Sequence, residues 1–527
     1  GYFAAAYEIT LHEGRLENYR RLNTKEEIGD ALERGKRVRF GYVKLMEEEN
    51  WFEDQSYVDT MNPEAIREFI RITHESYAKT VGEEFGTIIP AIFTDEPRMG
   101  KHALLSWSES DEDVTMPYTE YMAEQMKKKF GLDPLDIVPE YIWEPVDENN
   151  YVYRYYYREC ATECFTEAFM DQISDWCGRH GIAMTGHVLS EDSLYSQTFA
   201  LGECMRCYRK MDIPGIDILV DAREFATVKQ AVSVAHQNGR EAVASELYGV
   251  TQWDCSFKTY KLQGDWQAAL GITVRIPHLS HMSLKGEAKR DWPASIFYQS
   301  PWYKEFSAVE DHFARLNTAL TRGRAVVNIG VIHPVESMWR YFGPNDLTAG
   351  IREEIDRDFS EMIRWMLYGN LDFDFISEAL LPQQYRQTDE TGILQVGDMK
   401  YSAVLVPGLK SMRSTTRNIL EKFAERGGKI IFMGEIPWIE DGKCSEDIRM
   451  LAEKCQTIPK SRAALYKALE EERIIEIMRD DGCRADTLFY QMREDGEVKW
   501  LFISHVMPQK KHLSSPENYM IIIRGEW

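Results

Sequence analysis

Residues 215–249 decide the fold, and they read GIDILVDAREFATVKQAVSVAHQNGREAVASELYG. An apolar run ends in Asp221, a helical pattern extends from Phe225 to Asn238, and a second strand pattern, Glu241 to Ser245, leads into Glu246. A strand, a helix and a second strand in this order are typical of a βαβ unit in a parallel sheet. The stretch therefore predicts an α/β fold with acidic residues where its strands end.

Similar units surround this stretch over residues 1–325. The predicted strands are Tyr2 to Leu11, Arg37 to Met46, Thr87 to Thr94, Ile182 to Leu189, Gly215 to Val220, Glu241 to Ser245 and Ile272 to Pro277. Long helical patterns alternate with them, which is typical of a (β/α)8 TIM barrel. Seven strands are assigned, so we expect the first barrel strand to be missing. Because an open barrel leaves two unpaired edges, we expect the chain alone to express poorly or to be inactive.

The rest of the chain predicts two smaller domains. Residues 326–458 carry short strands and crossover helices, with Gly427-Gly428 before a strand, and this pattern favours a flavodoxin-like α/β domain. Residues 459–527 carry alternating strands that indicate the beginning of a truncated β-rich domain. We therefore expect a barrel catalytic domain over residues 1–325, followed by these two domains.

The composition limits the classes of partner. The net charge of −24, from 62 basic and 86 acidic residues, disfavours nucleic acid and anionic membranes, because both bind concentrated basic patches. The sequence contains no run of 18 apolar residues, so no membrane-spanning helix is predicted. Nine cysteines, an odd number, indicate reduced thiols and slightly favour the cytoplasm, whereas export stays open because the chain starts at Gly1 without Met. The oligomeric state is not predicted.

Ionisable side chains follow five of the predicted strands. They are Asp95 and Glu96, His187 and Glu191, Asp221, Glu246, and His278 and His281. The carboxyl ends of barrel strands converge on one face, so these groups are expected to surround a single site. Five strands that end this way indicate a function more strongly than any one of them would.

Two glutamates in this set suit the hydrolysis of a glycosidic bond. That reaction needs one protonated carboxyl for the leaving oxygen and one carboxylate that acts on the anomeric carbon or on water. We predict Glu96 and Glu246 as these catalytic groups, three strands apart in the ring. The predicted substrate-binding residues are hydroxyl-binding or sugar-stacking side chains, namely Asp95, His187, Glu191, Asp221, Tyr248, His278, His281 and Trp292.

Other interpretations remain open at this point. A carboxylate after a strand often caps the next helix, and a single histidine is more often structural than catalytic. His187, His278, Asp95 and Glu246 could instead bind a catalytic divalent metal, as in amidohydrolases, although the His-x-His motif of an early strand is absent. A barrel that binds carbohydrate but has lost catalysis is the alternative outside the enzymes.

Three motifs of the chain resemble glycoside hydrolase family 106, the α-L-rhamnosidases. They are Val58-Asp59-Thr60-Met61-Asn62-Pro63-Glu64-Ala65, Phe93-Thr94-Asp95-Glu96-Pro97 and Gly186-His187-Val188-Leu189-Ser190-Glu191. The stretch from Ser245-Glu246-Leu247-Tyr248-Gly249 to Pro301-Trp302 is similar to the later half of that barrel, and the resemblance covers residues 38 to 430. The α/β unit that follows is similar to the second domain of family 42 β-galactosidases.

This resemblance implies an inverting hydrolysis, often assisted by calcium, of terminal α-L-rhamnosides from pectic glycans or plant glycosides. Glu96 and Glu246 would be the acid and the base, in an order that the resemblance leaves open. Calcium is implied by the family alone, without assigned ligands. The family 42 similarity keeps a retaining β-galactosidase-like glycosidase as the alternative enzyme.

Overall fold

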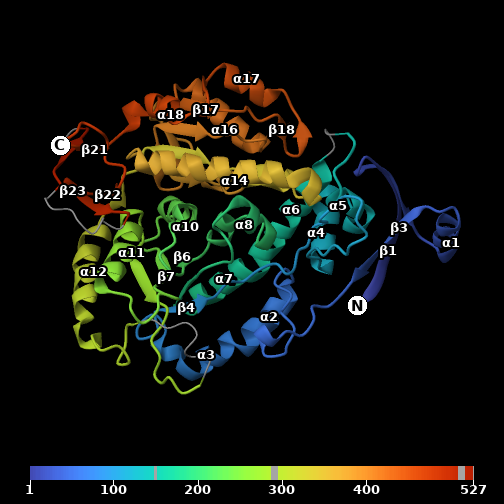
Figure 1. Ribbon diagram of the computed structural model, residues 1–527, viewed down its shortest axis with the longest axis horizontal. Coiled ribbons are helices and arrows are strands. Elements are labelled where there is room, and N and C mark those ends of the chain that lie inside the picture. The colour runs from blue at the N-terminus through green and yellow to red at the C-terminus, as the bar shows by residue number, and fades with distance from the viewer. Residues whose placement is uncertain (148–150, 287–294, 508–516, 526–527) are drawn as a thin grey trace.

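The computed structural model describes residues 1–147, 151–286, 295–507 and 517–525. Its body is a mixed α/β structure in which a curled parallel sheet lies beside a second α/β unit, with the long helix α14 (Asn345–Tyr368) between them (Figure 1). Among the described residues, no helix is both long and apolar enough to cross a membrane.

The first sheet positions the candidate site. Its five strands are parallel and follow the order β4-β5-β6-β7-β8. They are β4 (Ala91–Thr94), β5 (Ala183–Gly186), β6 (Ile213–Ile218), β7 (Ala244–Leu247) and β8 (Val274–Pro277). The sheet curls into half of a barrel, and its carboxyl-terminal strand ends lie along one edge.

The assignment of residues 2–11 and 37–46 to the barrel was wrong. β1 (Tyr2–His12), β2 (Arg15–Leu22) and β3 (Arg37–Val43) form a separate antiparallel sheet in the order β2-β1-β3. Glu13 and Gly14 turn the chain with positive φ values of 50° and 75°, which makes a tight hairpin between β1 and β2. This local antiparallel pairing replaces the distant parallel pairing that the strand patterns suggested.

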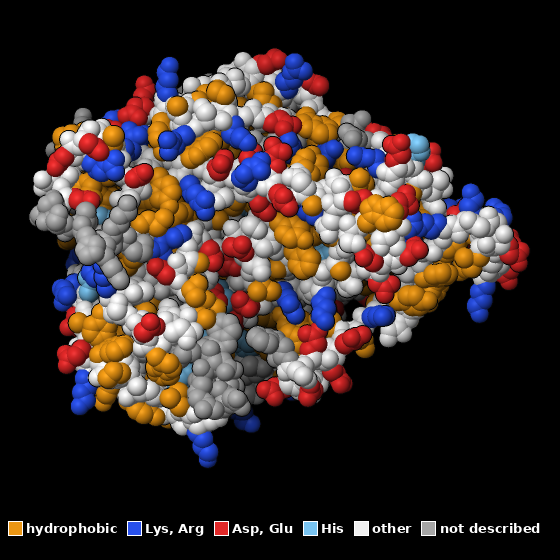
Figure 2. All heavy atoms as spheres, viewed as in Figure 1, with side chains coloured by type: hydrophobic (Ala, Val, Ile, Leu, Met, Phe, Trp, Pro, Cys, Tyr) orange, Lys and Arg blue, Asp and Glu red, His pale blue; other side chains and the backbone are white. Residues whose placement is uncertain are grey.

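The N-terminal sheet stands out from the body of the molecule at the right of Figure 1. The short helix α1 (Lys25–Glu33) packs on it, and Thr24 begins that helix with a capping box. Phe3, Phe40 and Tyr42 are exposed on its strands. Figure 2 shows hydrophobic side chains along the same projecting arm, with charged groups around α1 at its tip.

Helices cover the first sheet. They are α2 (Pro63–Ile72), α3 (His74–Val81), α4 (Glu120–Phe130), α5 (Val138–Ile142), α6 (Val152–Phe165), α7 (Gln172–Arg179), α8 (Leu194–Ala200), α9 (Cys204–Cys207), α10 (Phe225–Gln237), α11 (Phe257–Ala269) and α12 (Ser307–Leu320). Asn62 caps α2 as predicted, because its side-chain oxygen accepts from the Glu64 amide at 3.0 Å. A π-helical turn, Thr166–Asp171, joins α6 to α7 in one long helix.

The second sheet is also parallel, in the order β11-β10-β15-β17-β20. Its strands are β10 (Ile329–Ile332), β11 (Asp374–Ile376), β15 (Ala403–Val406), β17 (Lys429–Met433) and β20 (Gln456–Ile458). In chain order this is 2-1-3-4-5, the strand order of flavodoxin-like folds. The helices of this unit, besides α14, are α13 (Val335–Arg340), α15 (Leu381–Gln384), α16 (Ser414–Glu425), α17 (Asp447–Glu453) and α18 (Arg462–Ala468).

Short strands complete the second half of the chain. Two small sheets, β12-β13-β14 and β16-β18-β19, accompany the second parallel sheet, and β9-β22-β23 and β21-β24 follow toward the C-terminal end. Their bounds are β9 (Arg324–Ala325), β12 (Tyr385–Arg386), β13 (Leu394–Val396), β14 (Met399–Tyr401), β16 (Ser411–Met412), β18 (Ile439–Glu440), β19 (Lys443–Cys444), β21 (Ile475–Arg479), β22 (Leu488–Asp495), β23 (Val498–His505) and β24 (Tyr519–Ile523).

Helix α10 joins the two parallel sheets, because it packs against β6 of the first and β11 of the second. It is buried on nearly all sides, and its polar groups reach the second unit. Lys229 pairs with Asp372 at 2.9 Å, and His236 contacts Asp374 at 2.9 Å. The second α/β unit therefore supports the β6 to β7 part of the first sheet from behind.

Gly186 permits the close approach of β4 and β5. Its φ is 122°, and a Cβ atom there would lie 2.0 Å from the carbonyl oxygen of Thr94. We expect Gly186→Ala to lower the free energy of unfolding by about 3 kcal/mol, because backbone has to move. Urea unfolding measures the effect. Gly178→Ala in α7 is the control, because its Cβ would have no neighbour within 4 Å; equal stability of the two variants would contradict the packing.

Candidate active site

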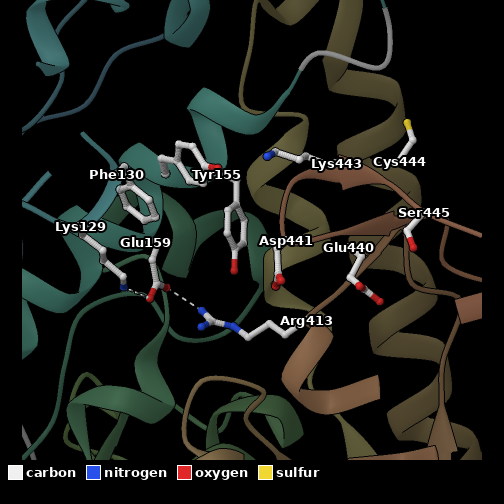
Figure 3. Close-up of a pocket in the computed structure, with 11 residues that line it drawn as sticks. Lys129, Phe130, Tyr155, Glu159, Arg413, Glu440, Asp441, Lys443, Cys444 and Ser445 are labelled. Atoms are coloured by element: carbon white, nitrogen blue, oxygen red, sulfur yellow. Dashed lines mark hydrogen bonds and ion pairs between the residues drawn. The ribbon is translucent and has the colours of Figure 1, made fainter. Parts of the chain in front are cut away.

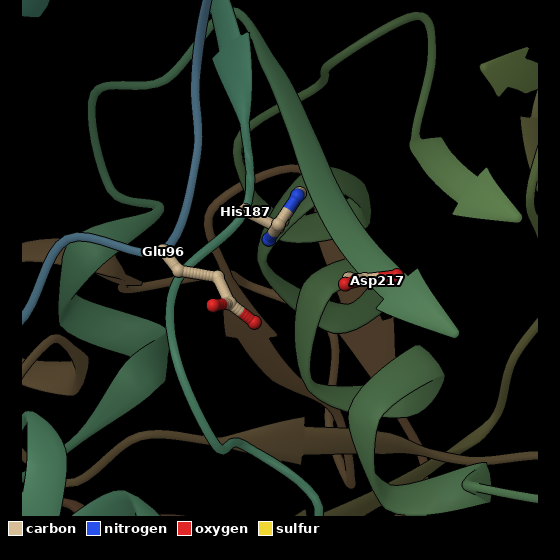
Figure 4. A group of neighbouring side chains, drawn as sticks. All are labelled: Glu96, His187 and Asp217. Carbon is tan, nitrogen blue, oxygen red and sulfur yellow. The ribbon is translucent and has the colours of Figure 1, made fainter. Parts of the chain in front are cut away.

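Side chains from four neighbouring strands meet at the carboxyl-terminal edge of the first sheet. Glu96 follows β4, His187 directly follows β5, Asp217 lies in β6 and Glu246 lies in β7. Glu96, His187 and Asp217 converge from their three elements (Figure 4). One oxygen of each of the two carboxylates and one nitrogen of His187 all lie within 4.8 Å of one another.

His187 is the centre of this group. Its side chain is 1% exposed, and its Nε2 atom lies 2.9 Å from Oε2 of Glu246 and 3.7 Å from Oδ1 of Asp95. Burial alone would lower its pKa, but the hydrogen bond with Glu246 and the charges of Asp217 and Glu191 outweigh burial and raise the pKa to about 9. The imidazole is therefore protonated at neutral pH and donates to Glu246.

Glu96 has the properties of a proton donor. Its side chain is exposed as a whole, yet desolvation of the carboxyl is the largest cause that raises its pKa. The charge of His187 opposes this rise, whereas the neighbouring charges of Asp95 and Glu246 add to it. A carboxyl that holds its proton to higher pH, at the open side of a group of acids, suits general acid catalysis.

Asp217 is the site residue that the sequence interpretation missed. It is the register partner of Glu246 across the β6 to β7 ladder, and burial raises its pKa to about 7. Its Oδ1 atom is buried and has no hydrogen-bond partner within the described chain. The sequence did carry a signal, because an aspartate between Ile216 and Ile218 in a parallel strand is unusual for a buried apolar run.

Glu191 lies behind this group. It is 4% exposed, burial raises its pKa to about 8, and its Oε1 accepts from the Tyr208 hydroxyl at 3.5 Å. The charge of His187 acts in the opposite direction on the same carboxyl. Glu191 therefore influences the site through the charge of His187.

Asp221 and Tyr248 have partners outside the group around His187. Asp221 pairs with Arg223 and accepts from Trp266 at 3.2 Å, although it also follows β6. Tyr248 is fully buried, and its hydroxyl accepts from Arg275 at 3.1 Å. Neither side chain joins the group of acids in the structure.

The two later histidines and the tryptophan are placed differently. The ring of His278 packs over Gly249, where a Cβ atom would lie 3.1 Å from its Nδ1. His281 is half-buried, and its carbonyl accepts from Gln299 at 2.5 Å. Trp292 lies outside the described residues. The sugar-binding roles predicted for these three residues stay predictions.

The turns that carry the group have unusual backbone conformations. Glu96, Ser190, Val220 and Tyr248 have positive φ values of 45°, 62°, 49° and 74°, one after each of four successive strands. Such values cost a β-branched residue like Val220 more than most others. Strain that recurs at four strand ends is typical of a surface shaped for function.

The same residues include a possible metal-binding group. Glu96, His187 and Asp217 form the one potential metal-binding group in the described part of the chain, and His278 does not belong to it. A protonated His187 cannot bind a metal, and calcium prefers six to eight oxygen ligands. The carboxylate of Asp217 fits a hard cation, because its Oδ1 is buried without a partner.

Asp217 makes the stability of the folded chain depend on pH. Its pKa of about 7 in the folded chain exceeds the ordinary value of 3.8, so its contribution to the free energy of unfolding is fully present below pH 3.8 and is lost as the pH rises through 7. The asparagine of Asp217→Asn does not titrate. Between pH 4 and pH 8, we therefore expect the free energy of unfolding of this variant to rise by about 1–3 kcal/mol relative to that of the unchanged protein. Urea unfolding at both pH values measures this gain. Parallel pH profiles for Asp217→Asn and the exposed control Asp254→Asn would contradict it.

Comparison with known proteins identifies the family. The sequence model of glycoside hydrolase family 106, described as α-L-rhamnosidase, matches residues 38–505. The chain belongs to this family. The predicted family resemblance is therefore confirmed. No curated protein matches the sequence.

Solved structures share the fold of this family 106 chain. A rhamnosidase from Novosphingobium sp. PP1Y has a TM-score of 0.63 and 18% identity, over 85% of this chain and 42% of that one. A catalytic mutant of a family 42 β-galactosidase from G. stearothermophilus has a TM-score of 0.61 and 11% identity, over 88% and 81%. The chain thus spans less than half the length of that rhamnosidase.

A third similar structure carries a different activity. It is a family 42 exo-carrageenase from Bacteroides ovatus, with a TM-score of 0.53 and 10% identity, over 85% of this chain and 64% of that one. At these identities the likeness concerns the fold alone. It agrees with the predicted similarity to family 42 and with the curled parallel sheet.

Proposed function

We propose that the chain hydrolyses a terminal α-L-rhamnoside of a plant or pectic glycan, with Glu96 and Glu246 as its two acting carboxyls. The observation that carries this proposal is their convergence on His187 in a chain of the α-L-rhamnosidase family. The family implies a carbohydrate substrate, and the proposal specifies an α-L-rhamnoside as that substrate.

In the proposed reaction, Glu96 gives its proton to the glycosidic oxygen and Glu246 takes a proton from the attacking water. Glu96 suits the first role because desolvation raises its pKa. Glu246 suits the second because the His187 imidazolium holds Oε2 of its carboxylate at 2.9 Å and so fixes its direction. His187 acts as a positioning residue, since its side chain is almost wholly buried.

Turnover of nitrophenyl glycosides tests the substrate. We expect release of nitrophenol from the α-L-rhamnoside, and much less from the β-D-galactoside, β-D-glucoside and α-D-mannoside. Hydrolysis of the galactoside alone would move the proposal to a β-galactosidase-like activity, which the fold of the family 42 enzyme supports. Binding of rhamnosides without any turnover would instead favour a barrel that has lost catalysis.

Calcium is proposed as a cofactor, with Asp217 as the side chain that would hold it. The orphaned Oδ1 of Asp217 supports this choice. A bound calcium ion supplies positive charge that orients sugar hydroxyls.

Removal of calcium is expected to lower kcat/KM and the melting temperature together. Dialysis against EGTA, followed by addition of calcium or zinc, measures both. Recovery with calcium alone supports calcium as the cofactor. Unchanged turnover and melting after EGTA would contradict it, and full dependence on zinc would favour the metal-hydrolase alternative.

A further inference from the structure

A cleft of about 580 Å³ lies between the two α/β units, away from the candidate active site (Figure 3). Helices α4 and α6 form one side of it, and the β18–β19 hairpin with the start of α16 forms the other. It shares no residue with the group around His187. Its volume lies within the range of about 300–1,000 Å³ that is usual for small-molecule sites.

One wall of the cleft is aromatic. Phe130 and Tyr156 stack with ring centroids 4.0 Å apart at an interplanar angle of 15°, and Tyr155 lies beside them on α6. All three side chains are half-buried, so part of each ring faces the cleft. No hydrogen bond engages the hydroxyl of Tyr155 or Tyr156 within the described chain. The wall thus offers apolar ring surface together with two free hydroxyls.

Charged side chains line both sides of the cleft, and most of them are paired. Glu159 accepts from Lys129 at 2.8 Å and from Arg413 at 2.6 Å. Asp441 accepts from the amide of Ser414 at 3.2 Å. Lys443 extends toward the aromatic wall in Figure 3, and no ion pair of its ammonium occurs in the part of the chain that is described. The charged groups of the cleft therefore offer fixed acceptors and one available donor.

The charges that line the cleft balance. Lys129, Lys443 and Arg413 face Glu159, Glu440 and Asp441. A balanced lining attracts neither an anion nor a cation strongly, and aromatic faces bind apolar ring surface. A pyranose ring has such an apolar face, with hydroxyls around its edge that suit carboxylates and ammonium groups.

We propose that this cleft binds a neutral sugar unit of a glycan, at a second site separate from the group around His187. The proposal rests on the aromatic wall, on the charged side chains of the cleft and on the glycoside hydrolase family, and not on the proposed rhamnoside specificity. A glycan held there would keep the enzyme near its polymer while another end of the glycan is hydrolysed.

Ligand-observed NMR with three probes tests the second site: methyl α-L-rhamnopyranoside, methyl β-D-galactopyranoside and methyl β-D-glucopyranoside. The protein carries Glu246→Gln to prevent turnover, with or without Tyr156→Ala or Lys443→Ala. We expect at least one probe to bind about tenfold more weakly to each cleft variant, which corresponds to about 1.4 kcal/mol. The matched controls are Tyr77→Ala and Lys454→Ala, which change exposed side chains outside the cleft.

The same substitutions in the otherwise unchanged protein should leave nitrophenyl glycoside turnover within the error of measurement, and Lys443→Ala should also leave the melting temperature unchanged. Unchanged binding of all three probes in both cleft variants would overturn the proposal, as would equal losses in the controls. Binding of inorganic phosphate at the cleft in place of the glycosides would overturn it too. Failure to hydrolyse a rhamnoside would contradict the proposed function and leave this test unaffected.

Discussion

Glu246→Gln is expected to lower kcat by about 10³-fold, because the amide keeps the shape of the side chain but cannot take a proton from water. The fall should be similar for nitrophenyl and methyl rhamnosides, since the attacking water is the same for both. Steady-state kinetics on the two substrates measure it. Glu241→Gln is the matched control, because that glutamate is exposed before β7.

Glu96→Gln should separate the two roles. Nitrophenol leaves without help from an acid, so the loss should be about 10-fold or less on the nitrophenyl substrate and about 10³-fold on the methyl rhamnoside. The opposite pattern in the two variants would exchange the roles of Glu96 and Glu246. Full activity in both variants would remove the pair from the mechanism.

Arg206→Met is expected to have the largest effect on stability, about 3–5 kcal/mol. The Arg206 side chain is 1% exposed and pairs with Glu203 at 2.5 Å, Glu159 at 2.7 Å and Glu163 at 3.4 Å. Without it, buried carboxylates lose their main counter-charge. Glu159 also pairs with Arg413 of the second unit, so the contact between the two units should weaken as well.

Thermal unfolding measures this loss, and a fall of roughly 3–5 °C in melting temperature is expected. Arg449→Met provides the control, because that arginine is 67% exposed and its ion pairs are on the surface. If both arginine variants melted at the same temperature, the buried network would contribute little.

Local patterns in the sequence predicted much of the fold. The ends of β4 at Thr94 and of β8 at Pro277 were predicted to the residue, because short apolar or β-branched runs between turns mark strands clearly. The strand β2 was missed, since half of the residues in RLENYRRL are charged and only its two leucines are buried. The pairing of β1 and β3 was also wrong, because a strand pattern does not specify the strand with which it pairs.

The candidate site was predicted in part. Strand ends that converge are a property of parallel sheets, so Glu96, Glu246 and His187 could be brought together from their spacing alone. The direction of each side chain could not be predicted, because it depends on turns such as the one at Val220, whose φ is 49°. Asp221 after that turn consequently points to Arg223, whereas Asp217 within the strand contacts the group.

The anomeric form of the first product tests the central claim most directly. If Glu96 and Glu246 act as acid and base on an α-L-rhamnoside, ¹H NMR during hydrolysis should show β-L-rhamnose first, followed by its slow conversion to the α form. Initial α-L-rhamnose would mean a covalent intermediate and would contradict Glu246 as the base that activates water.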